Sequence, residues 1–259
     1  MRRCALMVLG VAALMAVSAV GIAVAAGGEG PVTVRVGEET DLTPNIGFTP
    51  KALSRTSYTS IQASIAQEVR AEYGHPPAER EVLLELDRNL MVQTKGLPSC
   101  AVHLQTERSI DQRCKGAVVG SGKETFQIAY PENDAINIPT KVRVFNGGER
   151  DGAITMYVYS YFSTPVITGP LVTNVVFRRI HNGRFGWLAD AQLPQIAGGS
   201  GSVVDLDLKI GRQYSYEGKE ASVLSAKCTD GKLQARLQVG FEDGTSGETT
   251  LTRACTPEG

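Results

Sequence analysis

Residues 181–257 read HNGRFGWLADAQLPQIAGGSGSVVDLDLKIGRQYSYEGKEASVLSAKCTDGKLQARLQVGFEDGTSGETTLTRACTP. Apolar and polar residues alternate more regularly in this stretch than anywhere else in the chain. Glycine and Asp-Gly pairs interrupt it about every ten residues, which is typical of short antiparallel strands joined by turns. The stretch therefore predicts an all-β fold, and the expected architecture is an antiparallel β-sandwich of two packed sheets.

Segments before this stretch extend the same pattern. The runs AITMYVYSYF (153–162) and VTNVVFRRI (172–180) are rich in β-branched and aromatic residues, and they predict central strands that are buried on both faces. Residues 57–70 have a helix-like composition but also alternate, and we expect a strand there. Residues 109–114 (SIDQRC), with Ser109 as a cap, predict the one short helix of the mature chain.

A Pro-flanked connector at residues 131–139 (PENDAINIP) is the candidate domain boundary. Composition does not change across it, and no repeat of fixed period is visible. A single β-rich domain over residues 26–259 is the simpler prediction, and two half-size β domains are the alternative.

The N-terminal residues have the pattern of a signal peptide. Arg2 and Arg3 precede an uncharged, mostly apolar run, and Ala23-Val24-Ala25 forms an A-x-A cleavage site. We expect residues 1–25 to be removed and the protein to be secreted. The alternative is an uncleaved anchor, because the run from Cys4 to Ala26 is long enough to span a bilayer.

Charge and cysteine content narrow the function classes. Lys plus Arg total 26 against 27 for Asp plus Glu, which argues against nucleic-acid binding. Four cysteines follow the expected cleavage site, and an even number in an exported chain predicts two disulfides. Of the three possible pairings we favour the local one, which joins Cys100 to Cys114 and Cys228 to Cys255.

Two glycine-rich stretches resemble catalytic motifs only superficially. Residues 116–124 (GAVVGSGKE) differ from a phosphate-binding P-loop, because Ala117 and Glu124 replace residues that the motif needs. Residues 198–202 (GGSGS) lack the final glycine of a nucleophile elbow. Both stretches are interpreted as turns.

The histidines allow two further site hypotheses. Cys100, His103 and Cys114 could be drawn as zinc ligands, but a disulfide is favoured in an oxidising compartment. His181, Asp190 and Ser200 could form a hydrolytic triad, although many other triples are equally possible without geometry. No catalytic residue and no cofactor is predicted.

Asp205 and Asp207 alternate with Val204, Leu206 and Leu208, so both carboxylates project from one face of a strand. They could bind calcium or act as a glycosidase pair. A solvated outer face is the favoured interpretation, so no metal site is predicted.

The single tryptophan, Trp187, stands close to Phe185 in the chain. We expect the two rings to form a buried aromatic pair between the sheets, rather than a platform on which a ligand stacks.

Several stretches of the mature chain form a recognisable set. They are GLPSC, the Cys-Lys of residues 114–115 with the following VVGSG, HNGRFGW, IAGGSGSV, SAKCTDGKLQA, FEDGT and the final CTP. Together these stretches resemble a family of secreted actinobacterial proteins. The resemblance covers most of the mature chain. It implies a secreted, disulfide-containing β protein and no particular activity.

The expected function is that of a secreted or envelope-associated module, without catalytic activity, that binds a surface or protein ligand or serves a structural role. The alternative is a secreted hydrolase acting on glycans or esters. The absence of a complete catalytic motif favours the binding or structural protein.

Overall fold

A computed structural model describes residues 22–23, 29–100, 110–130, 133–164 and 167–259. These residues form an all-β fold, as predicted. Thirteen of their strands pair in one sheet of order β1-β19-β18-β7-β13-β12-β11-β10-β9-β14-β6-β3-β2. Neighbouring strands of this sheet are antiparallel, apart from the short parallel pairing of β1 with β19.

The strands of the large sheet are β1 (Ile22–Ala23), β2 (Val34–Val36), β3 (Thr40–Thr49), β6 (Gln62–Ala71), β7 (Glu79–Asp87), β9 (Val118–Tyr130), β10 (Asn133–Arg150), β11 (Ala153–Ser163), β12 (Thr168–Asn182), β13 (Phe185–Gln192), β14 (Gly201–Ile210), β18 (Lys232–Phe241) and β19 (Ser246–Ala254). Shorter strands are β4 (Ala52–Ser54), β5 (Thr59–Ser60), β8 (Leu90–Val92), β15 (Gln213–Tyr216), β16 (Lys219–Ser222), β17 (Leu224–Ala226) and β20 (Thr256–Glu258). The helical segments are α1 (Ile110–Arg113) and the 3₁₀ turns η2 (Lys115–Ala117) and η3 (Ala197–Gly199).

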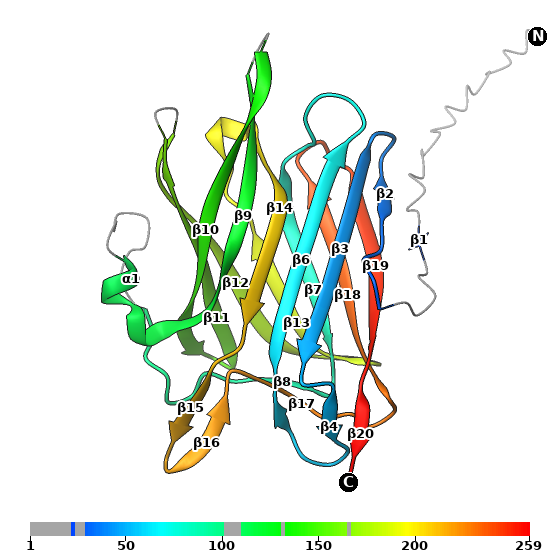
Figure 1. The fold of residues 1–259 in the computed structure, drawn as a ribbon, viewed down its shortest axis with the longest axis vertical. Coiled ribbons are helices and arrows are strands. Elements are labelled where there is room, and N and C mark those ends of the chain that lie inside the picture. The colour runs from blue at the N-terminus through cyan, green and yellow to red at the C-terminus, as the bar shows by residue number, and fades with distance from the viewer. Residues whose placement is uncertain (1–21, 24–28, 101–109, 131–132, 165–166) are drawn as a thin grey trace, which may run out of the picture.

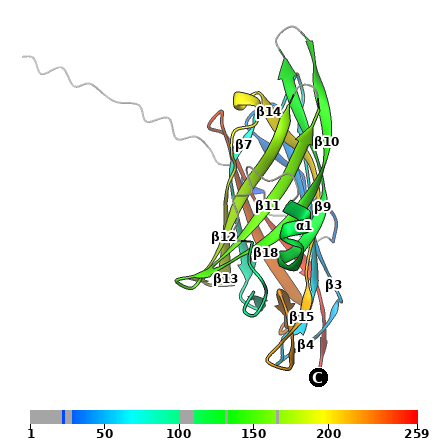
Figure 2. The same cartoon turned by 90° about the vertical axis from the view of Figure 1, so that its left-hand side faces the viewer.

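The large sheet curls until its two halves face each other (Figures 1 and 2). Strands β9 to β13 form a meander, which β14, β6, β3 and β2 extend on one side and β7, β18 and β19 extend on the other. The two layers of the expected sandwich are therefore halves of one nearly closed sheet. Its apolar interior includes Trp187, which is buried in the main core cluster as predicted.

The sheet closes along a seam between β19 and strands β2 and β3. At this seam Gly247 lies so close to β2 that a Cβ atom would come within 2.7 Å of Val36. The guanidinium of Arg253, on β19, donates to the carbonyl oxygen of Ile46 at 2.5 Å and to Oδ1 of Asn45 at 2.8 Å. Side-chain contacts therefore stabilise the closed sheet at this seam, while backbone pairing joins its strands elsewhere.

The strands predicted at residues 57–70, 153–162 and 172–180 are confirmed as β6, β11 and β12. The hairpin between β10 and β11 turns at Asp151 and Gly152, which both have positive φ, as a tight hairpin turn requires. β11 and β12 are central in the sheet, but the prediction that both faces are buried is wrong for β12. The outer face of β12 is exposed at Asn174 and Arg178, whereas Tyr159 of β11 is buried in a cluster with Ile110 and the first disulfide.

Two local interpretations are corrected by the structure. Gly120 and Gly122 are not in a turn but inside β9, where a Cβ on Gly122 would lie 2.0 Å from the Asp207 carbonyl oxygen of β14. Residues 133–139 of the predicted connector belong to β10, and Ile138 pairs with Phe126 of β9.

Both predicted disulfides are present. Cys100 and Cys114 are joined, as are Cys228 and Cys255. The predicted short helix is confirmed as α1, and it places Ile110 against the first disulfide in a small core cluster. Two disulfides indicate an oxidising environment.

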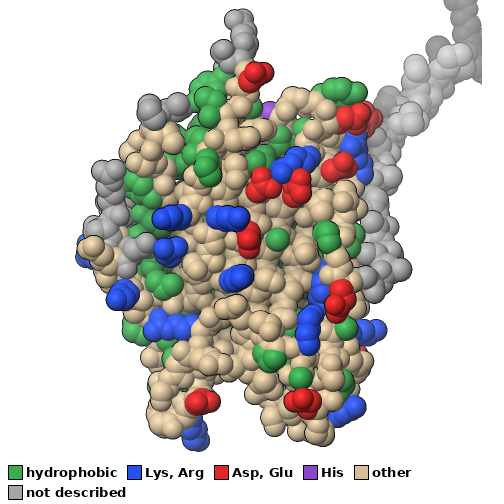
Figure 3. Space-filling model, in the orientation of Figure 1, with side chains coloured by type: hydrophobic (Ala, Val, Ile, Leu, Met, Phe, Trp, Pro, Cys, Tyr) green, Lys and Arg blue, Asp and Glu red, His purple; other side chains and the backbone are tan. Residues whose placement is uncertain are grey.

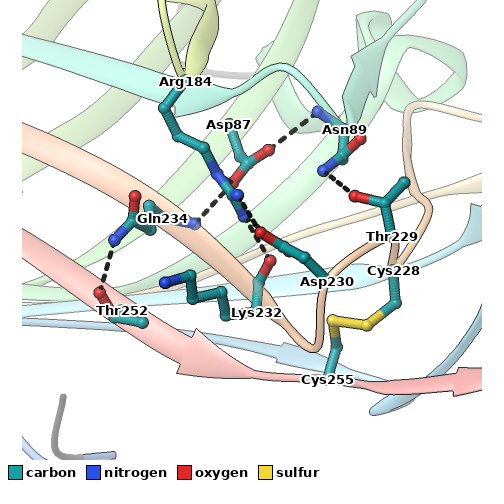
Figure 4. A network of polar contacts seen from close by, with 10 residues as sticks. All are labelled: Asp87, Asn89, Arg184, Cys228, Thr229, Asp230, Lys232, Gln234, Thr252 and Cys255. Atoms are coloured by element: carbon teal, nitrogen blue, oxygen red, sulfur yellow. Dashed lines mark hydrogen bonds and ion pairs between the residues drawn. A yellow bond between two sulfur atoms is a disulfide. The ribbon is translucent and has the colours of Figure 1, made fainter.

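A network of polar contacts ties together the lower end of the sheet (Figure 4). Asp87, at the end of β7, is fully buried, and its Oδ2 accepts from Nε of Arg184 at 2.5 Å and from the backbone N–H of Gln234 at 3.0 Å. Its Oδ1 accepts from the backbone N–H of Asn89 at 3.0 Å. Arg184 also contacts the exposed Asp230. The network thereby joins three segments that are distant in the sequence.

Candidate functional site

Two adjoining cavities lie inside the curled sheet. The larger has a volume of about 190 Å³ and the smaller about 90 Å³. They share the lining residues Ile46, Ile65, Leu84, Phe177 and Ile210. A cavity of about 150 Å³ accepts benzene, so the interior has room for a ligand larger than one aromatic ring.

The lining of the larger cavity is apolar except for four side chains, Gln67, Glu79, Glu124 and Thr173. An apolar cavity with a few polar groups is the usual form of a small-molecule site. Glu79 and Glu124 are only 8% and 7% exposed, which is rare for glutamate. These two carboxyls are therefore the notable chemical groups of the cavity.

Glu79 begins β7 in one half of the sheet and meets Gln67, which projects from β6 in the other half. The amide Nε2 of Gln67 donates to Oε1 of Glu79. Burial raises the pKa of Glu79 to about 7; the hydrogen bond from Gln67 opposes this shift, and the charge of Glu124 adds to it. Glu124 is thus close enough for the two carboxyls to repel each other when both are ionised.

Glu124 lies on β9 and turns inward. Its Oε1 accepts from the hydroxyl of Ser160 on β11. Burial raises the pKa of Glu124 to about 7 as well, and the hydrogen bond from Ser160 opposes the shift. Near neutral pH this cavity therefore holds two carboxyls that gain or lose a proton easily.

Sequence reasoning did not identify either glutamate, although a signal existed for one. Glu124 alternates with Phe126 and Ile128 in the segment KETFQIAY, which places an acid on the apolar face of a strand. An acid in register with core residues is a candidate for function. Glu79 stands before the apolar part of β7, and its local sequence contains no comparable signal.

The Asp205/Asp207 pair lies on the outer face of β14, as predicted. Oδ1 of Asp205 is 2.9 Å from the guanidinium of Arg70, and Asp207 pairs in register with Lys123. Figure 3 shows that basic and acidic side chains mix on this face of the molecule. The described residues include no group of three or more metal-ligating side chains. Cations of the protein itself already neighbour both carboxylates.

The hypothetical triad is not assembled. Asp190 pairs with Val176, so His181 lies about 16 Å further along β12 at the usual rise of a strand. The carboxylate of Asp190 instead faces Arg178 at 3.5 Å. Ser200 follows η3 in the predicted glycine turn, and β14 begins at the next residue, Gly201.

The structure also bears on the hypothetical zinc ligands and on the expected pair of Trp187 and Phe185. Cys100 and Cys114 are consumed in a disulfide, and His103 lies outside the described residues. Trp187 is buried, but Phe185 is only half-buried and packs under the guanidinium of Arg236 at 5.1 Å. The guanidinium of Arg179 covers the Trp187 ring at 3.9 Å. The expected aromatic pair is thus replaced by two cation–aromatic contacts.

Comparisons with known proteins add no assignment. No family model matches the sequence, and neither a curated protein nor a solved structure matches the chain. Within the part of the chain that the structure describes, none of the helices has the length and apolar character needed to cross a membrane.

Proposed function

We propose that this protein is an exported, non-enzymatic binding protein that holds a small apolar ligand inside its curled sheet. The observation that carries the proposal is the pair of adjoining apolar cavities. Close packing is the rule in protein interiors, and larger voids cost stability unless something occupies them. In a carrier protein, the bound ligand fills such a void. The competing function, a secreted hydrolase, loses support because His181 and Asp190 of the candidate triad lie far apart along β12 and β13.

Filling the larger cavity with a side chain should weaken the binding of an apolar ligand. Ala191, on β13, lines this cavity, and Ala191→Phe would place a ring in the space that a ligand needs. We expect the affinity for naphthalene, a neutral apolar probe, to fall at least about tenfold. Equilibrium dialysis with detection of naphthalene fluorescence measures the change.

Ser121→Phe is the matched control, because Ser121 is exposed on the outer face of β9. This variant adds the same ring outside the cavity and should bind naphthalene as the wild type does. Melting curves of both variants check that each is folded. Equal binding by the Ala191→Phe variant and the wild type, with both folded, would contradict the proposal.

Export is the second part of the proposal. It is supported by the n-region, the apolar run and the A-x-A site, together with the two disulfides. We expect the protein recovered from culture supernatant of a secreting host to begin at Ala26, as measured by intact mass. Recovery of the full-length chain in the membrane fraction alone would instead indicate an N-terminal anchor.

A further inference from the structure

The two glutamates of the larger cavity accept hydrogen bonds from neutral groups. Glu79 accepts from the amide of Gln67, and Glu124 accepts from the hydroxyl of Ser160. Among the described residues, no cationic side chain lines this cavity. A carboxylate in an apolar interior is costly without a counter-charge, so each group must either keep a proton or receive a cation.

The positively charged side chain that lines the smaller cavity is already engaged. Arg253 lines the smaller cavity, but its guanidinium donates to the Ile46 carbonyl, to Asn45 and, at 3.0 Å, to the carbonyl oxygen of Gly30. These contacts close the seam between β19 and β3. Arg253 is therefore committed to the fold and does not serve the glutamates.

The charge of the cavity selects among apolar ligands by their polar group. A fatty acid would bring a third carboxylate beside Glu79 and Glu124, and like charges repel strongly at low dielectric. An alcohol would form a hydrogen bond and leave the charge uncompensated. A basic nitrogen would supply both a donor and the missing positive charge.

We propose that the ligand is a small apolar amine, whose ammonium group lies against Glu79 and Glu124 while its hydrocarbon part fills the two cavities. This inference rests on the proposed function, since it names the class of ligand for the same cavity. A neutral amine that enters takes the proton of a carboxylic acid and becomes ammonium, and the acid becomes carboxylate. An ammonium that enters at higher pH meets carboxylates that are already ionised.

The preference for an amine should depend on pH. Glu79 and Glu124 are the titratable side chains that line the larger cavity within the described residues, and Arg253 is the charged one in the smaller cavity. Because the pKa of each glutamate is raised to about 7, both are largely protonated at pH 5 and largely ionised at pH 8.5. At pH 5 an ammonium must displace a proton, so its advantage shrinks.

The test compares octylamine, octan-1-ol and octanoate, which share one chain and differ in the polar group. Displacement of naphthalene from the secreted protein, which is expected to begin at Ala26, gives the affinity of each compound at pH 8.5. We expect octylamine to bind at least about tenfold more tightly than octan-1-ol, and octanoate more weakly than either. At pH 5 the advantage of the amine over the alcohol should be lost.

Variants locate the effect in the two glutamates. In the Glu79→Gln/Glu124→Gln double variant, the preference for octylamine over octan-1-ol at pH 8.5 should vanish. Glu220→Gln is the matched control, because Glu220 is exposed on β16, and it should retain the preference. The comparison of pH 5 with pH 8.5 in the wild type needs no variant, so it decides the question if the double variant does not fold.

The outcomes separate the two proposals. If octan-1-ol binds and octylamine is no tighter, or if the double variant keeps the preference, the amine assignment is overturned and the binding function stands. If none of the three compounds nor naphthalene binds, both proposals fail.

Discussion

Raising the pH from 5 to 8.5 is expected to lower the free energy of unfolding by about 2–3 kcal/mol for each of Glu79 and Glu124. In the folded protein, burial raises the pKa of both from 4.5 to about 7. Between these values the folded state binds more protons than the unfolded state, so stability falls as the pH rises through this window. The loss is complete above the folded pKa, where both carboxyls are ionised in either state.

Urea denaturation at a series of pH values measures this dependence. The Glu79→Gln/Glu124→Gln variant should be less sensitive to pH and more stable than the wild type at pH 8.5, because a neutral amide avoids the cost of a buried charge. Glu220→Gln, on the exposed surface, should keep the wild-type slope. An unchanged slope in the double variant would show that other groups cause the dependence.

Replacing Asp87 by Ala is expected to lower the free energy of unfolding by about 3–5 kcal/mol, the usual effect of breaking a buried ion pair. The change removes the carboxylate that accepts from Arg184 and leaves the buried backbone N–H groups of Asn89 and Gln234 without this acceptor. For a protein of this size the melting temperature should fall by about 10 °C. Differential scanning calorimetry at neutral pH measures it.

Asp230→Ala provides a close control for this prediction. Asp230 contacts the same guanidinium of Arg184, but its side chain is 41% exposed against 0% for Asp87. Exposed ion pairs contribute little, so a loss of about 0–1 kcal/mol is expected. Equal losses in the two variants would mean that burial does not decide the strength of this network.

The sequence alone determined the features that depend on local pattern. Alternation of apolar and polar residues predicted the all-β class and strand β6, and β-branched and aromatic content predicted β11 and β12. Turn chemistry correctly located a glycine turn before β14, although Gly201 and Ser202 already belong to the strand. The favoured disulfide pairing also proved right, since each bond joins cysteines that lie close in the chain. These features involve near neighbours, whose spacing the sequence displays directly.

Other local interpretations failed because a distant strand decided the outcome. The glycines at 120 and 122 seemed to mark a turn, yet they allow β14 to approach the backbone of β9. Residues 133–139 were interpreted as a connector between two prolines, yet they pair with β9 as part of β10. A glycine or proline can stand in a turn or inside a strand, and the partner strand determines which applies.

The candidate site itself depended on tertiary structure. Glu79 and Glu124 belong to β7 and β9, which lie in different parts of the sheet order, and they line one cavity only because the sheet curls. Closure requires the long-range pairing of β14 with β6 and the side-chain contacts of Arg253 across the seam. Periodicity shows which face of a strand is apolar. It does not show which strands will face one another, and that arrangement sets the burial and the proton affinity of the two carboxyls.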